Sequence, residues 1–273
     1  MITNLGTLLR YRSLIINLAL KDLRVKYRSP FLGFLWAFLT PLCTVIIFHI
    51  VFSLILRVPA QDYPFFIYLM TAIFSWRFFQ VSITRAMMSI VDNKSLVKEV
   101  AFPRELLPLS VIVAELFNYI PSLAIILIFL PCFGIPFSIL IVFLPLVVFL
   151  HFLFALGIAL LVSALQVKYR DTQYIIEIVL TGLFYLTPVF YWLNSVTQFF
   201  SKPFLMLYLF NPLVGMLNLY RIVLLKGFIT TLPPEVTISN LIVSPLLATV
   251  STLILGFYFF RKNEKLFADY LSI

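Results

Sequence analysis

Long apolar stretches separated by short polar ones dominate the chain. Residues 31–56 contain no charged side chain, and later apolar stretches reach the roughly 20 residues that a helix needs to cross a bilayer. We expect six transmembrane helices, at residues 31–56, 64–88, 106–130, 138–165, 174–191 and 241–260. The pattern therefore predicts an all-α integral membrane protein in which residues 1–273 form a single transmembrane domain.

Residues 1–30 come before the first predicted span and have a different pattern. One face of a helical wheel collects apolar side chains: Leu5, Leu9, Ile16, Ala19 and Leu23. The opposite face carries Arg10, Asn17, Lys21 and Arg24. This pattern predicts an N-terminal amphipathic helix lying in the membrane interface. The segment is not a signal peptide, because its apolar stretch at residues 15–20 is too short and has no cleavage site.

The segment between the fifth and sixth spans is ambiguous. Residues 204–225 are apolar enough for another span, but Asn211-Pro212 interrupts them. Proline removes a helical hydrogen bond and restricts the preceding residue, which leaves two halves of about 18 Å each. Halves this short favour a re-entrant extracytoplasmic gate segment at residues 193–237, shaped by Pro188, Asn211 and Pro212. The alternative is a surface hairpin resting on the outer leaflet.

Charge sets the orientation of the six spans. With the N-terminus inside, one side collects 15 Lys and Arg residues and the other side collects Arg57, Lys202, Arg221 and Lys226. This asymmetry obeys the positive-inside rule, so both termini are predicted to be cytoplasmic. The rule also accounts for the net charge of +9 without a nucleic-acid partner. With 62% hydrophobic and 11% charged residues, the composition excludes an ordinary soluble domain.

The sequence contains no recognisable motif for catalysis, nucleotide binding or metal binding. A phosphate-binding loop needs closely spaced glycines, whereas the eight glycines here are never closer than the twelve positions that separate Gly215 from Gly227. Cys43 and Cys132 stand alone, without a metal or redox motif. We therefore expect no catalytic residue, no metal site and no cofactor bound by this chain, so the chain is not itself an enzyme.

Two charged residues fall deep inside predicted spans. Counted from the expected helix ends, Arg77 and Glu115 lie at similar depths of about 13 to 16 Å, and a lone charge at that depth is costly. We expect them to form an intramembrane ion pair. Proton coupling through Glu115 is the alternative.

Several motifs together carry a family resemblance. They are YRSPFLGFLWAFLTPL (27–42), NKSLVKEVAFPRELLPL (93–109), KYRD (168–171), FYLTPVFY (184–191), FNPLVGMLNLYR (210–221) and KLFAD (265–269). In this order they resemble the membrane subunits of polysaccharide-exporting ABC transporters, the type-2 permease family. The likeness covers nearly the whole chain and is specific in combination.

The resemblance implies a homodimer with two copies of a separate nucleotide-binding ATPase, which would hold the ATP and magnesium. It also implies export of a lipid-linked glycan, of the O-antigen, capsule or teichoic acid type, across the bacterial inner membrane. Residues 91–105 would then form a cytoplasmic coupling helix that contacts the ATPase through Lys94, Lys98, Glu99, Arg104 and Glu105. The alternative is an ordinary solvated loop.

Aromatic rings are suited to holding sugars loosely, because they offer broad stacking faces. We expect seven of them to line the conduit: Phe31, Phe34, Phe38, Phe184, Tyr185, Tyr191 and Trp192. The alternative is that these rings face lipid or the protein core. Two other functions stay open, namely an ABC exporter of drugs or small lipids, and a self-contained channel or secondary carrier.

Overall fold

The computed structural model describes residues 10–27, 33–57 and 62–271, and this part of the chain is helical without a β-strand. The long helices are α2 (Arg12–Tyr27), α3 (Trp36–His49), α4 (Phe65–Asp92), α6 (Leu106–Cys132), α7 (Leu144–Lys168), α8 (Thr172–Tyr185), α11 (Pro212–Leu224) and α12 (Ile238–Glu264). The short ones are α5 (Lys94–Glu99), α9 (Leu193–Phe199), α10 (Lys202–Leu209) and α13 (Phe267–Tyr270). A π-helix, Ile50–Ile55, extends α3, and 3-10 turns are formed by Gly33–Leu35, Ile139–Phe143 and Phe228–Thr231.

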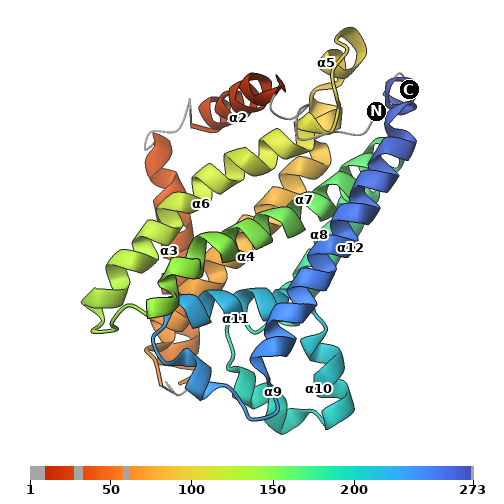
Figure 1. The fold of residues 1–273 in the computed structure, drawn as a ribbon. Helices are drawn as coiled ribbons and strands as arrows, with labels where there is room; N and C mark the ends of the chain where they lie inside the picture. The colour runs from red at the N-terminus through yellow and green to blue at the C-terminus, as the bar shows by residue number, and fades with distance from the viewer. Residues whose placement is uncertain (1–9, 28–32, 58–61, 272–273) are drawn as a thin grey trace.

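Helix α4 is the centre of the bundle (Figure 1). In its most apolar stretch 83% of the residues are buried, against 11% in the stretch Phe38–Ile55 that contains most of α3. Helices α6, α7, α3 and α11 all pack against α4. Because α3 buries so little surface in the single chain, most of its apolar side chains are left for lipid or for another subunit.

The closest helix pair is α7 with α12. Gly157 of α7 faces Gly256 of α12, and a Cβ atom built on Gly157 would lie 2.6 Å from the backbone nitrogen of Leu253. Small residues allow two backbones to approach closely, and this is how helices associate inside a membrane. Ala155, Ala159 and Ser163 are further small residues of α7, and they too are buried within the subunit.

The two ends of the bundle differ. Helices α2 and α5 and the C-terminal turn α13 lie at one end, called here the α5 end, while α9 and α10 lie at the other, the α10 end (Figure 1). Helix α2 runs against α6 and buries Ala19. Residues 12–27 of the predicted N-terminal helix are helical, whereas Leu5 and Leu9 lie outside the described residues.

Five of the six predicted spans are confirmed as helices that are long and apolar enough to cross a membrane: Phe38–Ile55, Phe65–Asp92, Leu106–Cys132, Ile139–Lys168 and Ile238–Glu264. The fifth predicted span, residues 174–191, is only partly helical. Helix α8 ends at Tyr185, and its 14 residues reach about 21 Å. Pro188 explains this early end, because proline disfavours a helical conformation at the residue before it.

The chain from Thr172 to Trp192 nevertheless extends from the α5 end toward the α10 end. It begins just after α7, and Trp192 packs against Phe65 and Tyr68 in the first turns of α4. Backbone that leaves the helix at membrane depth must find partners in the protein. Arg221 supplies them, since its guanidinium donates to the carbonyl oxygens of Pro188 at 2.6 Å and Val189 at 3.4 Å.

Helices α10 and α11 form a bent pair. Their axes differ by 77° across the break at residues 210–211, where the sequence places Asn211-Pro212. The Asn211 side chain accepts a hydrogen bond from the Leu213 backbone at 3.1 Å, and Pro212 occupies the first turn of α11. This N-cap and first-turn proline are favourable at a helix start. The interruption was therefore predicted correctly from the sequence.

Candidate functional site

A groove opens between α3, α4 and α8. It has a volume of about 250 Å³ and is lined by Thr44, Phe48, Ile73, Trp76, Arg77, Gln80, Thr181, Phe184 and Tyr185. We call it the aromatic groove. The ring of Phe184 lies 5.4 Å from that of Trp76 and 6.0 Å from that of Phe48, measured between centroids. The lining combines aromatic rings with polar groups, and aromatic rings offer broad stacking faces.

Only some of the predicted conduit residues reach this groove. Phe184 and Tyr185 line it, and Phe38 lies half-buried on α3, six residues before Thr44. Phe31 and the side chain of Phe34 lie outside the described residues. Tyr191 donates its hydroxyl to the carbonyl oxygen of Tyr185 at 3.1 Å.

Trp192 does not line the aromatic groove. Its side chain is only 6% exposed, and its ring centroid lies 4.0 Å from that of Tyr68. The helix ends before Trp192, so this residue no longer shares a face with Phe184. Trp192 therefore packs in the core and offers no stacking face.

The groove also contains three residues that were not predicted from the sequence: Phe48, Trp76 and Gln80. Phe48 lies ten residues beyond Phe38, the last phenylalanine of the first span that was predicted to line the conduit. Trp76 and Gln80 are four residues apart on α4, and the indole nitrogen of Trp76 donates to the Gln80 side chain at 3.2 Å. A polar side chain four residues from a tryptophan, inside a span, was the available signal.

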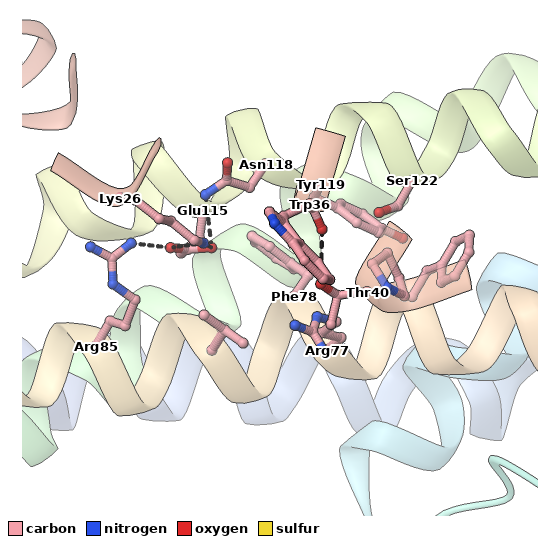
Figure 2. Close-up of a pocket in the computed structure, with 13 residues that line it drawn as sticks. Lys26, Trp36, Thr40, Arg77, Phe78, Arg85, Glu115, Asn118, Tyr119 and Ser122 are labelled. Atoms are coloured by element: carbon pink, nitrogen blue, oxygen red, sulfur yellow. Dashed lines mark hydrogen bonds and ion pairs between the residues drawn. The ribbon is translucent and has the colours of Figure 1, made fainter. Parts of the chain in front are cut away.

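A second cavity, of about 350 Å³, lies between α2, α3, α4 and α6 (Figure 2). We call it the cation cavity, because Lys26, Arg77 and Arg85 line it together with a single carboxylate, Glu115. Figure 2 shows Arg85 and Lys26 converging on Glu115, with Arg77 further along α4 and close to Thr40 of α3. Polar groups of Asn118, Tyr119 and Ser122 complete the lining from α6.

The partners of Glu115 differ from those predicted. Its carboxylate is buried and pairs with Arg85 and with Lys26 at 3.2 Å, and it accepts from Asn118 at 3.1 Å. The expected Arg77–Glu115 pair is not among the ion pairs that the described residues form. Helix α4 continues to Asp92 rather than ending at residue 88, so Arg85 lies level with Glu115 and Arg77 lies about two turns deeper.

Lys26 links helix α2 to this cavity. Partial burial lowers the pKa of its ammonium group, and the neighbouring carboxylate of Glu115 opposes that shift. The Lys26–Glu115 pair joins α2 to α6 where the two helices pack together. A change in the cation cavity would therefore act directly on α2.

The predicted coupling region divides into two parts. Lys94, Lys98 and Glu99 are exposed on or beside α5. Lys94 and Lys98 also line a groove of about 550 Å³ at the α5 end, together with Arg170 and Tyr270. This basic groove is accessible for a partner of opposite charge.

Arg104 and Glu105 face inward instead. Arg104 donates to the backbone carbonyl of Glu264 in α12 and to that of Val97 in α5, the latter at 3.4 Å. Glu105 is 6% exposed and its carboxylate lies 3.8 Å from the guanidinium of Arg261. Both residues hold the loop against α12, and their contact with a partner stays a prediction.

The predicted gate residues come together at the end of α8. Asn211 donates to the Thr187 hydroxyl at 3.3 Å, and Arg221 donates to the Pro188 carbonyl. Arg221 is fully buried, and its guanidinium carbon lies 3.5 Å above the centroid of the Tyr68 ring. A buried cation is costly unless hydrogen bonds and an aromatic face compensate it. Through Asn211 and Arg221, helix α11 and its N-cap therefore contact both α4 and residues 187–189.

Metal binding has no support in the part of the chain that the structure describes. No group of three or more His, Cys, Asp or Glu side chains is arranged to hold an ion within residues 10–27, 33–57 and 62–271.

Comparisons with known proteins agree with this architecture. The ABC-2 type transporter family matches residues 13–225. The O-antigen export system permease protein RfbA of Myxococcus xanthus is 34% identical over 221 residues, covering 81% of this chain and 84% of that protein. An RfbA protein of Klebsiella pneumoniae is 30% identical over 98% of this chain and 97% of its own length. The polysialic acid transport protein KpsM of Escherichia coli is 25% identical over 91% of this chain and 92% of its own length.

Proposed function

The chain belongs to the ABC-2 type transporter family, and we propose that it is the membrane subunit of an ABC transporter that exports lipid-linked polysaccharide. Relatives that match up to 98% of the chain are named as polysaccharide export or transport proteins. The observation that carries the substrate class is the aromatic groove, which combines Phe48, Trp76 and Phe184 with the polar groups of Gln80 and Thr181. ATP hydrolysis belongs to a separate nucleotide-binding subunit.

A homodimer would turn the aromatic groove into a conduit. Helices α3 and α8 border the groove, and they leave large apolar side chains uncovered: Ile47 is 60% exposed and Ile178 is 73% exposed. Two copies that meet along these helices would face their grooves toward one another. Exposed apolar surface on both sides of the aromatic groove supports such a contact between two copies.

The α5 end is the proposed cytoplasmic end. The positive-inside asymmetry of the sequence supports this orientation, since the basic groove with Lys94, Lys98 and Arg170 lies there. The ATPase would dock on α5 and this groove through acidic side chains. Arg104 and Glu105 would transmit its movement to α12, because they join the loop to that helix.

The α10 end is the proposed exit, with α10 and α11 as the gate. Its orientation is tested by labelling Ser201→Cys and Lys262→Cys in intact cells with an impermeant thiol reagent, after the two native cysteines are replaced by serine. We expect the first variant to react from outside and the second only after lysis. Labelling of both from outside would contradict the topology.

The function is tested by purifying the chain with its ATPase and reconstituting both in proteoliposomes. A lipid-linked polysaccharide should accelerate ATP hydrolysis, whereas a drug or a small lipid should not. Acceleration by small lipids alone would favour the alternative exporter. Flux through the isolated chain without an ATPase would favour a channel or carrier.

A further inference from the structure

Glu177 is an exposed carboxylate on α8, one of the helices that border the aromatic groove. It is the single acidic residue between Asp171 and Glu235, and it takes part in none of the ion pairs formed by the part of the chain that the structure describes. It lies about 8 Å beyond the start of α8 by helical rise. A carboxylate at such a depth is costly against lipid, so its position indicates hydrated or polar surroundings.

The helical geometry of α8 places Glu177 on the face that lines the aromatic groove. Thr181, Phe184 and Tyr185 line this groove from α8. At about 100° per residue, Phe184 lies about 60° to one side of Thr181 and Tyr185 about 40° to the other. Glu177 lies about 40° from Thr181 on the side of Phe184, and its carbonyl oxygen accepts a hydrogen bond from the Thr181 hydroxyl at 2.8 Å. Glu177 therefore continues this face one turn closer to the α5 end.

Along the bundle, the level of Glu177 lies between the basic groove and the aromatic groove. Gln173 lines the basic groove together with Met88 of α4, and Thr181 lines the aromatic groove together with Gln80 of α4. Glu177 is four residues, or one helical turn, from both Gln173 and Thr181. Polar side chains thus recur on successive turns of α8 from one groove to the other, and a polymer that passes between the grooves must pass Glu177.

The chemistry of a carboxylate fits a polymer of uncharged sugars. A carboxylate is a pure hydrogen-bond acceptor and sugar hydroxyls are donors, and hydrogen bonds to an ionised acceptor are roughly twice as strong as neutral ones. An acidic sugar brings like charge instead, and the repulsion is stronger in a low dielectric than in water. Arg77 also lines the aromatic groove, but it lies on the turn of α4 beyond Gln80, so a polymer that comes from the α5 end meets Glu177 first.

We propose that Glu177 is a specificity residue that makes the protein select uncharged sugars over acidic ones. Its carboxylate accepts hydrogen bonds from sugar hydroxyls where the polymer enters the aromatic groove, and it repels sugars that carry a carboxylate of their own. This inference rests on the proposed function, because it takes a polysaccharide as the substrate. It adds the chemical class of the sugars that the groove admits.

The test compares the binding of two hexasaccharides with one backbone, hexagalacturonic acid and its full methyl ester, to the purified full chain. Quenching of tryptophan fluorescence reports the aromatic groove, because Trp76 lines it and none of the described residues that line the basic groove is a tryptophan. We expect the wild type to bind the ester about tenfold more tightly than the acid, since only the acid brings charge against Glu177. This ratio should shrink between about 0.1 M and about 1 M salt, where the Debye length falls from about 10 Å to about 3 Å.

Substitutions at Glu177 should change this ratio and leave the melting temperature unchanged, because the side chain is exposed. Glu177→Gln should bring the two affinities to within about twofold of each other, since it keeps the shape and removes the charge. Glu177→Lys should reverse the preference, so that the acid binds more tightly than the ester. Glu177→Asp keeps the charge and should keep most of the discrimination.

Glu235→Gln is the matched control. Glu235 is an exposed carboxylate that lines neither groove and lies between the 3-10 turn Phe228–Thr231 and α12. Its loss changes the net charge by the same amount as the loss of Glu177, so it tests the effect of overall charge. The ratio in this variant should stay within about twofold of the wild-type value, because salt screens distant charges.

Several results would overturn the inference. They are equal affinities of the wild type for acid and ester, a ratio that salt leaves unchanged, an equal loss of discrimination in Glu177→Gln and Glu235→Gln, and an unchanged ratio in Glu177→Gln. If Glu177→Gln dissociates a dimer in light scattering and leaves the ratio unchanged, the carboxylate is a contact between subunits and selects no sugar.

Failure of this inference is distinguishable from failure of the proposed function. If neither hexasaccharide binds but a lipid-linked polysaccharide accelerates ATP hydrolysis by the complex, the role of Glu177 is wrong and the proposed function stands. If Glu177 controls the ratio but no polysaccharide accelerates hydrolysis, the sugar selectivity of the groove stands and the proposed function is wrong.

Discussion

The close contact between α7 and α12 predicts that one methyl group added at Gly157 strongly lowers the stability of the protein. A Cβ atom at Gly157 would lie 2.6 Å from the Leu253 nitrogen and 2.6 Å from the Thr252 carbonyl carbon, both of them backbone atoms of α12. Ordinary contacts begin near 3.4 Å, so Gly157→Ala must push the two helices apart by about 0.8 Å. A gap of that size forfeits a quarter to a half of the dispersion energy across the interface.

We estimate the loss at about 3 kcal/mol, near the upper end for overpacked cores, because neither backbone can move alone. For a chain of this size, that lowers the melting temperature by roughly 6–10 °C. The assay compares variants in one detergent at one heating rate, following the folded fraction by fluorescence-detected size exclusion. A fixed heating rate matters because unfolding of this kind is often irreversible.

Gly182→Ala is the matched control for this prediction. Gly182 lies inside α8, and a Cβ built there meets nothing within 4 Å among the described residues. Alanine is favoured over glycine inside a helix by about 0.5–1 kcal/mol, so this variant should melt slightly higher than wild type. A Gly157→Ala protein that melts within about 2 °C of wild type would refute the close approach of α7 and α12.

Three further predictions follow from side-chain contacts. Glu105→Lys should lower the free energy of unfolding by about 2 kcal/mol, seen as a lower melting temperature, because it buries a cation beside Arg261. Adding Arg261→Glu should recover most of this loss, and no recovery would contradict the ion pair. Phe184→Ala should reduce polysaccharide export about fivefold through loss of a stacking ring, whereas Phe199→Ala, at an 83% exposed site outside the groove, should leave export unchanged. Arg221→Gln should destabilise the chain by about 2 kcal/mol in thermal unfolding, because it unpairs backbone carbonyls that the bundle buries; an unchanged melting point would show that they find other partners.

The helical class and the interruption at Asn211-Pro212 were predictable because each depends on local properties. A stretch of 20 apolar residues without charge has few stable alternatives to a spanning helix. Proline blocks a helix from within, whatever surrounds it.

The partner of Glu115 depended on where two helices lie along each other. Hydropathy placed the end of α4 at residue 88, whereas the helix ends at Asp92. Four residues correspond to about 6 Å of axial shift, which is more than an ion pair tolerates. The sequence therefore predicted that Glu115 needs a cation, and only the packing of α4 against α6 selected Arg85 and Lys26 over Arg77.

The aromatic residues show the same division. Composition alone determined that many rings must be present in the membrane-spanning part of the chain, with 17% of all residues being aromatic. Whether a ring faces a groove or the core depends on helix rotation and on where the helix stops. Because α8 ends at Tyr185, Phe184 enters the groove while Trp192 packs under Tyr68. An aromatic ring can face lipid, the protein core or a groove at similar cost, so only the tertiary structure shows which of these three places each ring takes.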